Sequence, residues 1–168
     1  AKNIVAGKNS DFSDVFVVDT HNKTIDRIKG LNGQEINGNS VQPMISGDGN
    51  FVVFSTFGSN VYKNDYTRNG EIVLWERVSG NIEPITPNGL GGHSVRPFLN
   101  NDGSYVVFES TATNLVHDDT NGVKDIFLFR GTASPLVRLT DNSYQKDYFF
   151  PSISDDGKKI AYASYSMA

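Results

Sequence analysis

The stretch PSISDDGKKIAYAS, residues 151–164, decides the fold because two earlier versions of it occur at a fixed interval. PMISGDGNFVVFST spans residues 43–56 and PFLNNDGSYVVFES spans residues 97–110, so each copy begins 54 residues after the previous one. A self-similar period of this length is typical of repeat architectures. We therefore expect a short array of one repeated unit.

Each copy predicts two antiparallel strands. A short segment after the proline ends at an Asp-Gly pair, which is a strong hairpin signal because glycine tolerates a positive φ. The run after that turn is almost continuously apolar, which is typical of a strand buried on both faces. These strand pairs are expected at 44–46 and 51–54, at 98–100 and 105–108, and at 152–154 and 159–162.

Two further strands complete the unit after a polar connection of about fifteen residues, whose Asn, Asp, Thr and Gly content is typical of a loop. They are expected at 72–75 and 82–86, and again at 126–129 and 136–140. The N-terminal region supplies only this second pair, since residues 14–17 align with 125–128. The chain is therefore expected to be one array: a half unit at 1–42, whole units at 43–96 and 97–150, and a half unit at 151–168.

Four antiparallel strands per unit, buried between similar units, describe the blade of an all-β propeller. The third copy also resembles a known family, because PSISDDGKKIAYAS is similar to the Pro-x-x-Ser-x-Asp-Gly phrase of TolB-like propeller repeats. NLVHDDTNGVKDIFLF, residues 114–129, resembles a second segment of those repeats, although residues 7–10 and 64–67 depart from its loop. The resemblance implies a periplasmic or secreted location and protein or peptide partners at the channel mouth. It implies no particular partner, because one fold serves many functions.

Three blade equivalents are too few to close a ring, since known propellers use about four to eight blades. Two identical chains fit that range, so we expect a head-to-tail homodimer with six blades. The C-terminal strand pair of each chain would join the N-terminal pair of the other, an exchange similar to domain swapping. The alternative is an excised or engineered half of a longer propeller, with no function of its own.

Composition narrows the class of partner. The net charge is -4 and the pI is about 5.3, which disfavours nucleic acid because its phosphates are normally met by a basic surface. No apolar run reaches the about eighteen residues that a membrane-spanning helix needs. The sequence contains no cysteine, so disulfide and thiol chemistry is excluded. The absence of cysteine fits the cytosol and the cell exterior equally well.

Candidate binding residues lie in the segments that lead into the first strands, because propellers usually bind ligands at the channel mouth. Arginine can bind a carboxylate bidentately and tyrosine offers a large amphipathic surface. The candidates are Gln42, His93, Arg96 and Tyr148. For each of them, an ordinary loop or core role is the alternative.

One loop of the third unit carries a cluster of oxygen ligands of the kind that calcium prefers. Its members are Asp118, Asp119, Asn121 and Asp125. The alternative is structural, since Asn and Asp in loops commonly accept hydrogen bonds from their own backbone. The sequence thus indicates no cofactor other than this possible calcium ion.

A catalytic centre is harder to recognise in this sequence. His21, His93 and His117 fall at different positions of the repeat, and no His and Glu cluster has metal-ligand spacing. The sequence therefore favours a non-enzymatic binding or scaffold protein. A hydrolase or lactonase-like propeller with calcium in its channel is the alternative.

Overall fold

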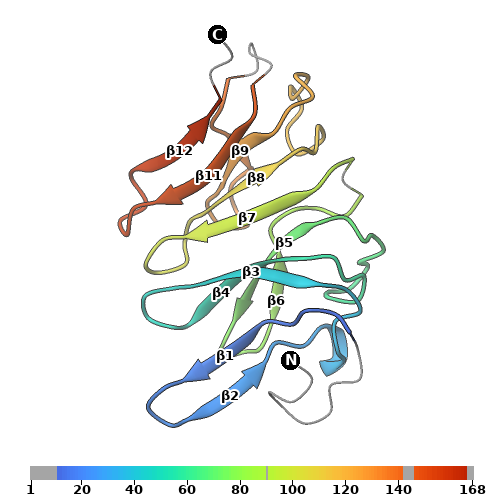
Figure 1. Cartoon of the computed structure of the whole chain (residues 1–168), viewed down its shortest axis with the longest axis vertical. Helices are drawn as coiled ribbons and strands as arrows, with labels where there is room; N and C mark the ends of the chain where they lie inside the picture. Colours follow the sequence, from blue (N-terminus) through green and yellow to red (C-terminus); the bar gives the residue numbers. More distant parts are fainter. Residues whose placement is uncertain (1–10, 90, 142–145, 166–168) are drawn as a thin grey trace.

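The computed structural model describes residues 11–89, 91–141 and 146–165. In this part of the chain all regular structure is β-strand except for one 3-10 turn at Leu31–Gly33. The strands form antiparallel sheets of two, four, four and two strands, stacked in chain order from one end of the molecule to the other (Figure 1). The all-β expectation is confirmed, and the arrangement is that of a partial propeller.

Two four-stranded sheets form the middle of the stack. Each is a meander in which consecutive strands pair. The first contains β3 (Ser40–Ile45), β4 (Phe51–Thr56), β5 (Glu71–Glu76) and β6 (Ile82–Pro84). The second contains β7 (Ser94–Leu99), β8 (Val106–Ser110), β9 (Asp125–Phe129) and β10 (Val137–Arg138).

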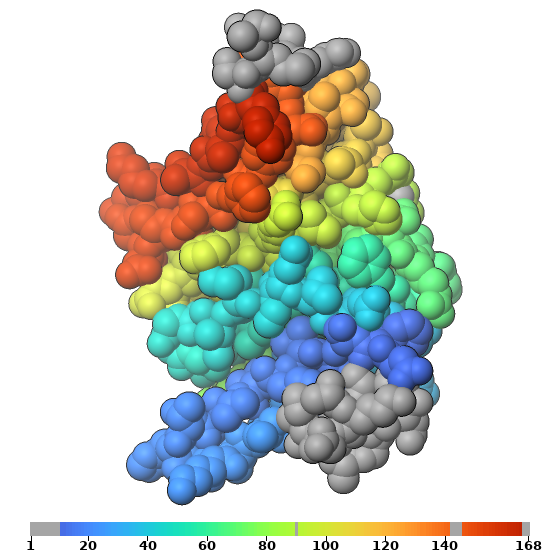
Figure 2. Space-filling model, viewed as in Figure 1, coloured from blue at the N-terminus to red at the C-terminus, as the bar shows by residue number. Residues whose placement is uncertain are grey.

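Two-stranded sheets lie at opposite ends of the stack (Figure 1). β1 (Phe16–Asp19) pairs with β2 (Thr24–Arg27) at one end, and β11 (Tyr148–Ile153) pairs with β12 (Ile160–Ser164) at the other. Figure 2 shows the same progression on the surface, from the N-terminal to the C-terminal colours. No helix in the described part of the chain has the length and hydropathy that a bilayer crossing requires.

The core lies between neighbouring sheets, because both faces of the inner strands are apolar. Phe108, Phe127 and Ile72 belong to the cluster that joins the two four-stranded sheets, and all three are fully buried. Smaller clusters join each outer sheet to its neighbour, with Phe54 in one and Val107 in the other. The predicted burial of the apolar strands on both faces is confirmed for β4 and β8.

Two of the three Asp-Gly turns have a second reason for glycine besides their backbone conformation. Gly103 and Gly157 have φ of 73° and 72°, values that glycine adopts without steric cost. A Cβ on Gly103 would stand 2.7 Å from the ring of Phe51, and one on Gly157 would stand 2.6 Å from the ring of Tyr105. Each turn therefore packs its bare backbone against an aromatic ring of the preceding unit.

The first strand of each unit begins earlier than predicted. Residues 40–42, 94–96 and 148–150 were expected in loops but belong to strands β3, β7 and β11, which run through the proline. The pairing register shifts at the proline in all three strands. A bulge at this point lets a strand tolerate a proline, which has no N–H for the ladder.

Candidate functional site

The residue before each proline is the repeated feature of the first strands. Gln42, Arg96 and Phe150 have φ of 57°, 51° and 54°, a left-handed conformation that is uncommon for residues other than glycine. They lie at the same position of three successive units, 54 residues apart. The bulge thus places three different side chains in equivalent positions along one side of the stack.

At two of these bulges, a side-chain oxygen of the neighbouring unit accepts the backbone N–H group. Arg96 N donates to Gln42 Oε1 over 2.9 Å, and Phe150 N donates to Glu109 Oε1 over 2.7 Å. These contacts cross from one sheet to the next, so the bulges connect the units as well as bending the strands. An otherwise unpaired N–H is satisfied at each junction.

Glu109 is the centre of a small charged group. Its side chain is completely buried, and its carboxylate lies 3.1 Å from both Arg96 Nη1 and Lys124 Nζ. Burying a carboxylate is costly unless it is paired and hydrogen-bonded, and here two cations and the Phe150 N–H fulfil that condition. One positive charge remains in excess among Arg96, Lys124 and Glu109, and the Arg96 side chain is 41% exposed.

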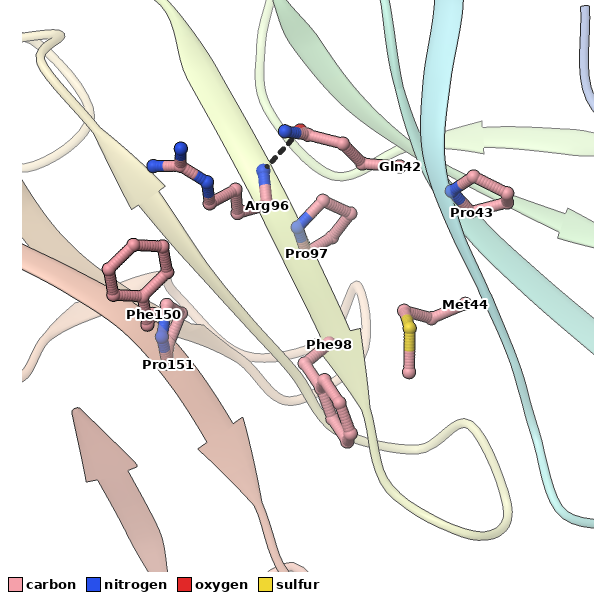
Figure 3. Close-up of a pocket in the computed structure, with 8 residues that line it drawn as sticks. All are labelled: Gln42, Pro43, Met44, Arg96, Pro97, Phe98, Phe150 and Pro151. Atoms are coloured by element: carbon pink, nitrogen blue, oxygen red, sulfur yellow. Dashed lines mark hydrogen bonds between the residues drawn. The ribbon is translucent and has the colours of Figure 1, made fainter.

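A pocket of about 330 Å³ opens over the bulges, at the lower end of the size range of ligand sites. Figure 3 shows the side chains that surround it, with Arg96 and Gln42 above an apolar base. The lining residues come from β3, β7 and β11: Gln42, Pro43, Met44, Arg96, Pro97, Phe98, Phe150 and Pro151. The guanidinium of Arg96 lies 4.8 Å from the ring centroid of Phe150, a cation–π contact that holds both at the rim.

Two of the four predicted binding residues lie together in this pocket, namely Gln42 and Arg96. His93 precedes β7 outside it, where Nδ1 accepts the N–H of Gly70 over 2.9 Å. Tyr148 is 9% exposed and packs edge-on against Tyr162 at 5.7 Å. The binding roles of all four remain a prediction, and the geometry favours Gln42 and Arg96.

Sequence reasoning did not select Phe150, Phe98, Glu109 or Lys124. Phe150 is 64% exposed. Its position before the repeated proline, equivalent to that of Arg96, was the available signal. For Glu109 the signal was a charged residue directly after the predicted apolar strand at 105–108.

Two of the four predicted calcium ligands, Asp118 and Asp119, contact the guanidinium of Arg138 in this structure. Asp119 Oδ1 lies 3.2 Å from Arg138 Nη1, and Arg138 Nη2 donates to the carbonyl of Asp118 over 3.4 Å. Asn121 Oδ1 accepts the N–H of Val123 over 3.1 Å, and Asp125 accepts the hydroxyl of Thr140. Within residues 11–89, 91–141 and 146–165, no three or more His, Cys, Asp or Glu residues form a group that could hold a metal ion.

The outer strands expose surface that the inner sheets bury. Tyr162 on β12 is 44% exposed, whereas Phe54 and Phe108 at the equivalent positions are fully buried. Val18 on β1 is 56% exposed, whereas Phe129 at the equivalent position is 5% exposed. Among the described strands, β1 pairs only with β2 and β12 pairs only with β11. Each outer sheet thus presents an open edge and a partly apolar surface.

No family model matches this sequence, and no curated protein matches it either. Among solved structures, a protein assigned as TolB from Agrobacterium tumefaciens aligns with a TM-score of 0.55 and 19% identity, covering 92% of this chain and 51% of that chain. The hydrazine synthase of Kuenenia stuttgartiensis aligns with a TM-score of 0.48 and 17% identity over 90% of this chain and 43% of that one, a similarity too low to carry an inference.

The similarity to the Agrobacterium protein shows the fold. Together with the sheets of two, four, four and two strands, it shows that this chain has the fold of a partial β-propeller, similar to that of the TolB structure. The chain spans about half the length of the solved structures it matches.

Proposed function

We propose that this chain is a non-enzymatic binding module that closes into a six-bladed ring with a second copy of itself and binds a protein or peptide at the pocket over the bulges. The observation that carries the proposal is the pair of open edges on the outer sheets. An exposed edge strand is a template for pairing with another chain unless it is covered. A propeller covers such edges by closing.

The whole blades supply the register for this pairing. β8 pairs with β9 so that Val106 faces Phe129 and Phe108 faces Phe127. The repeat makes β12 equivalent to β8 and β1 equivalent to β9. The same register would therefore place Ile160 of one copy opposite Val18 of the other copy, and Tyr162 opposite Phe16. The pairing would bury side chains whose equivalents in the whole blades are already buried, each worth ~1.5–3 kcal/mol when fully covered.

The charges at the ends of the open strands are complementary in this register. β4 pairs with β5 from Phe51, opposite Glu76, to Thr56, opposite Glu71. The residues equivalent to the Phe51–Glu76 pair are Lys159 and Asp19, which carry opposite charges. Opposite charges on facing strand positions favour the pairing.

The pocket has the features of a peptide site. Its base is apolar, with Met44, Phe98 and prolines, and its rim carries the Gln42 amide and the partly exposed Arg96 guanidinium. Arginine and aromatic side chains are enriched among the residues that contribute most to protein interfaces. In a two-chain ring this pocket would occur twice around the channel.

Cysteine cross-linking tests the proposed assembly, since the 168-residue sequence contains no cysteine. Val17 and Ala161 are equivalent to the facing pair Leu128 and Val107, so the double variant Val17→Cys, Ala161→Cys should oxidise to a covalent dimer. Facing residues on antiparallel strands lie about 4.5–5.5 Å apart, within reach of a disulfide. Within one chain, β1 and β12 lie at opposite ends of the stack (Figure 1).

The matched control is Val17→Cys, Ala163→Cys, which shifts one cysteine by two residues to a diagonal separation of about 7–8 Å. It should cross-link far less. A disulfide within one chain, a ladder of open oligomers, or equal cross-linking of both variants would contradict the closed ring in this register.

A further inference from the structure

Both whole blades bury a pair of acidic side chains beside their third strand. In the second four-stranded sheet the pair is Asp119 and Asp125, and in the first it is Asp65 and Glu71, each residue 54 positions earlier. All four are at most 6% exposed. Burial raises the pKa of Glu71 and of Asp119, and the charge of the other member of the pair raises it further. Asp65 and Glu71 accept hydrogen bonds from the adjacent residues Val61 and Tyr62.

The later pair has a cation of its own. Arg138 on β10 faces Phe127 on β9, and its Nη1 lies 3.2 Å from Asp119 Oδ1. Both side chains are almost completely buried, at 9% and 3% exposure. The guanidinium therefore offsets one of the two negative charges of the acidic pair inside the protein.

The N-terminal half unit, residues 1–42, also has an arginine at this position. Arg27 on β2 faces Phe16 on β1, the same register as the pairing of Arg138 with Phe127. Its Nη1 lies 2.8 Å from Glu35 and 3.9 Å from Asp14, with 8% of the side chain exposed. Asp14 is the repeat equivalent of Asp125, so a buried guanidinium meets a buried carboxylate here too.

The whole unit at residues 43–96, called the middle unit here, lacks this arginine. The residue that faces the equivalent strand position, Val73, is Pro84. Among the described residues no cationic side chain forms an ion pair with Asp65 or Glu71. Asp65 is 5% exposed, and its buried Oδ1 has no hydrogen-bond partner, although Oδ2 accepts the N–H of Val61 over 3.2 Å.

Neutral oxygens contact both carboxylate oxygens of Glu71. Glu71 accepts the hydroxyl of Tyr62 at Oε2 over 2.7 Å and the hydroxyl of Thr67 at Oε1. Thr67 also lies 3.3 Å from Asn88 Oδ1. Burial raises the pKa of both Asp65 and Glu71, as expected for carboxyl groups that are desolvated without a compensating charge.

We propose that the middle unit binds a calcium ion between Asp65 and Glu71, where the equivalent acidic groups of the other units hold an arginine. Carboxylate, hydroxyl and amide oxygens are ligands that calcium accepts in flexible arrangements of about six to eight. Magnesium is disfavoured, because it demands near-ideal octahedral geometry and releases its waters reluctantly. An ion bound here would stabilise the loop between β4 and β5, since Asp65, Tyr62 and Thr67 all belong to it.

Calorimetric titration of the metal-free chain with calcium chloride tests this site. The wild type should bind one calcium ion and unfold at a higher temperature when calcium is present. Asp65→Asn should weaken binding about tenfold or more, because calcium affinity follows the number of charged ligands. Terbium provides an independent readout, since Tyr62 lies at the site and should sensitise its luminescence.

Pro84→Arg is the decisive variant, because it installs the arginine that the neighbouring units already contain. It should abolish calcium binding while keeping the fold and raising the unfolding temperature of the metal-free protein. Asp119→Asn is the matched control in the later pair and should leave calcium binding unchanged. The proposal is overturned if the wild type binds no calcium at millimolar concentration, if Pro84→Arg binds it as well as the wild type, or if Asp119→Asn weakens binding as much as Asp65→Asn.

Discussion

Arg96 donates its backbone N–H to the side-chain Oε1 of Gln42 over 2.9 Å, although the two residues lie 54 positions apart at the same place in successive units. A proline follows each of them, and each takes a left-handed conformation. The contact therefore joins two bulges of one kind across the boundary between two sheets.

Gln42→Ala should lower the free energy of unfolding by about 1 kcal/mol, the usual net contribution of one hydrogen bond. The variant removes the oxygen that accepts from Arg96 and, over 3.3 Å, from the hydroxyl of Ser55. Urea denaturation measures the change. Gln34→Ala, at an exposed position, is the control and should leave the free energy of unfolding almost unchanged. Equal effects would show that the bulge contact contributes no stability.

Glu109→Gln should lower the free energy of unfolding by about 1–3 kcal/mol. This is the range for hydrogen bonds to charged groups and for buried groups left unsatisfied. The amide keeps the shape of the side chain but leaves Arg96 and Lys124 without their shared carboxylate. Guanidinium chloride denaturation at fixed pH measures the loss. Glu76→Gln removes a charge that accepts from the Ser79 hydroxyl at the surface and serves as control. Equal losses in the two variants would contradict the role of Glu109 as the centre of the charged group.

We expect the contribution of Asp102 to the stability of the fold to depend on pH. Hydrogen bonds, first from the Ser104 hydroxyl and then from its N–H, lower the pKa of Asp102 below its ordinary value of 3.8. A carboxyl group with a lowered pKa stabilises the fold above its unfolded-state pKa and loses that effect as the pH falls through its folded-state pKa. The unfolding temperature of the wild type should therefore be higher than that of Asp102→Asn at pH 6. The difference between the two unfolding temperatures should become smaller as the pH falls toward 2. A difference that stays constant across this range would contradict the assignment.

Selection from a random-peptide phage library tests the pocket as a binding site. Peptides that the wild type enriches should bind Arg96→Gln and Phe150→Ala about tenfold more weakly, since removing one important interface side chain costs at least ~1.4 kcal/mol. Arg68→Gln, which changes an exposed arginine outside the pocket, should bind normally. Failure to enrich any peptide, or equal binding by all variants, would count against a peptide site here.

The repeat predicted the fold closely because period, hairpin signals and apolar runs all follow from one repeated pattern. The apolar strands at 51–54 and 105–108 are buried within β4 and β8 as expected. The start of β3 was missed because a proline normally ends strand pairing. Only the left-handed Gln42 shows how the strand continues past Pro43.

The candidate sites depended on contacts between units, which spacing within a unit does not reveal. Gln42 and Arg96 come together because equivalent first strands lie side by side, whereas His93 precedes its strand and turns to Gly70. The loop with the richest oxygen cluster contacts Arg138, which lies on a later strand. The absence of this arginine from the middle unit became informative only once the strand register placed Pro84 at the same position.

The mass of the 168-residue chain in solution tests the proposed ring most directly. Light scattering coupled to size exclusion should give twice the chain mass of 18.4 kDa, about 37 kDa, across the micromolar range, and Val18→Lys with Tyr162→Lys should shift the protein toward monomer. A folded wild-type species that stays at 18.4 kDa at every concentration would contradict closure by a second copy.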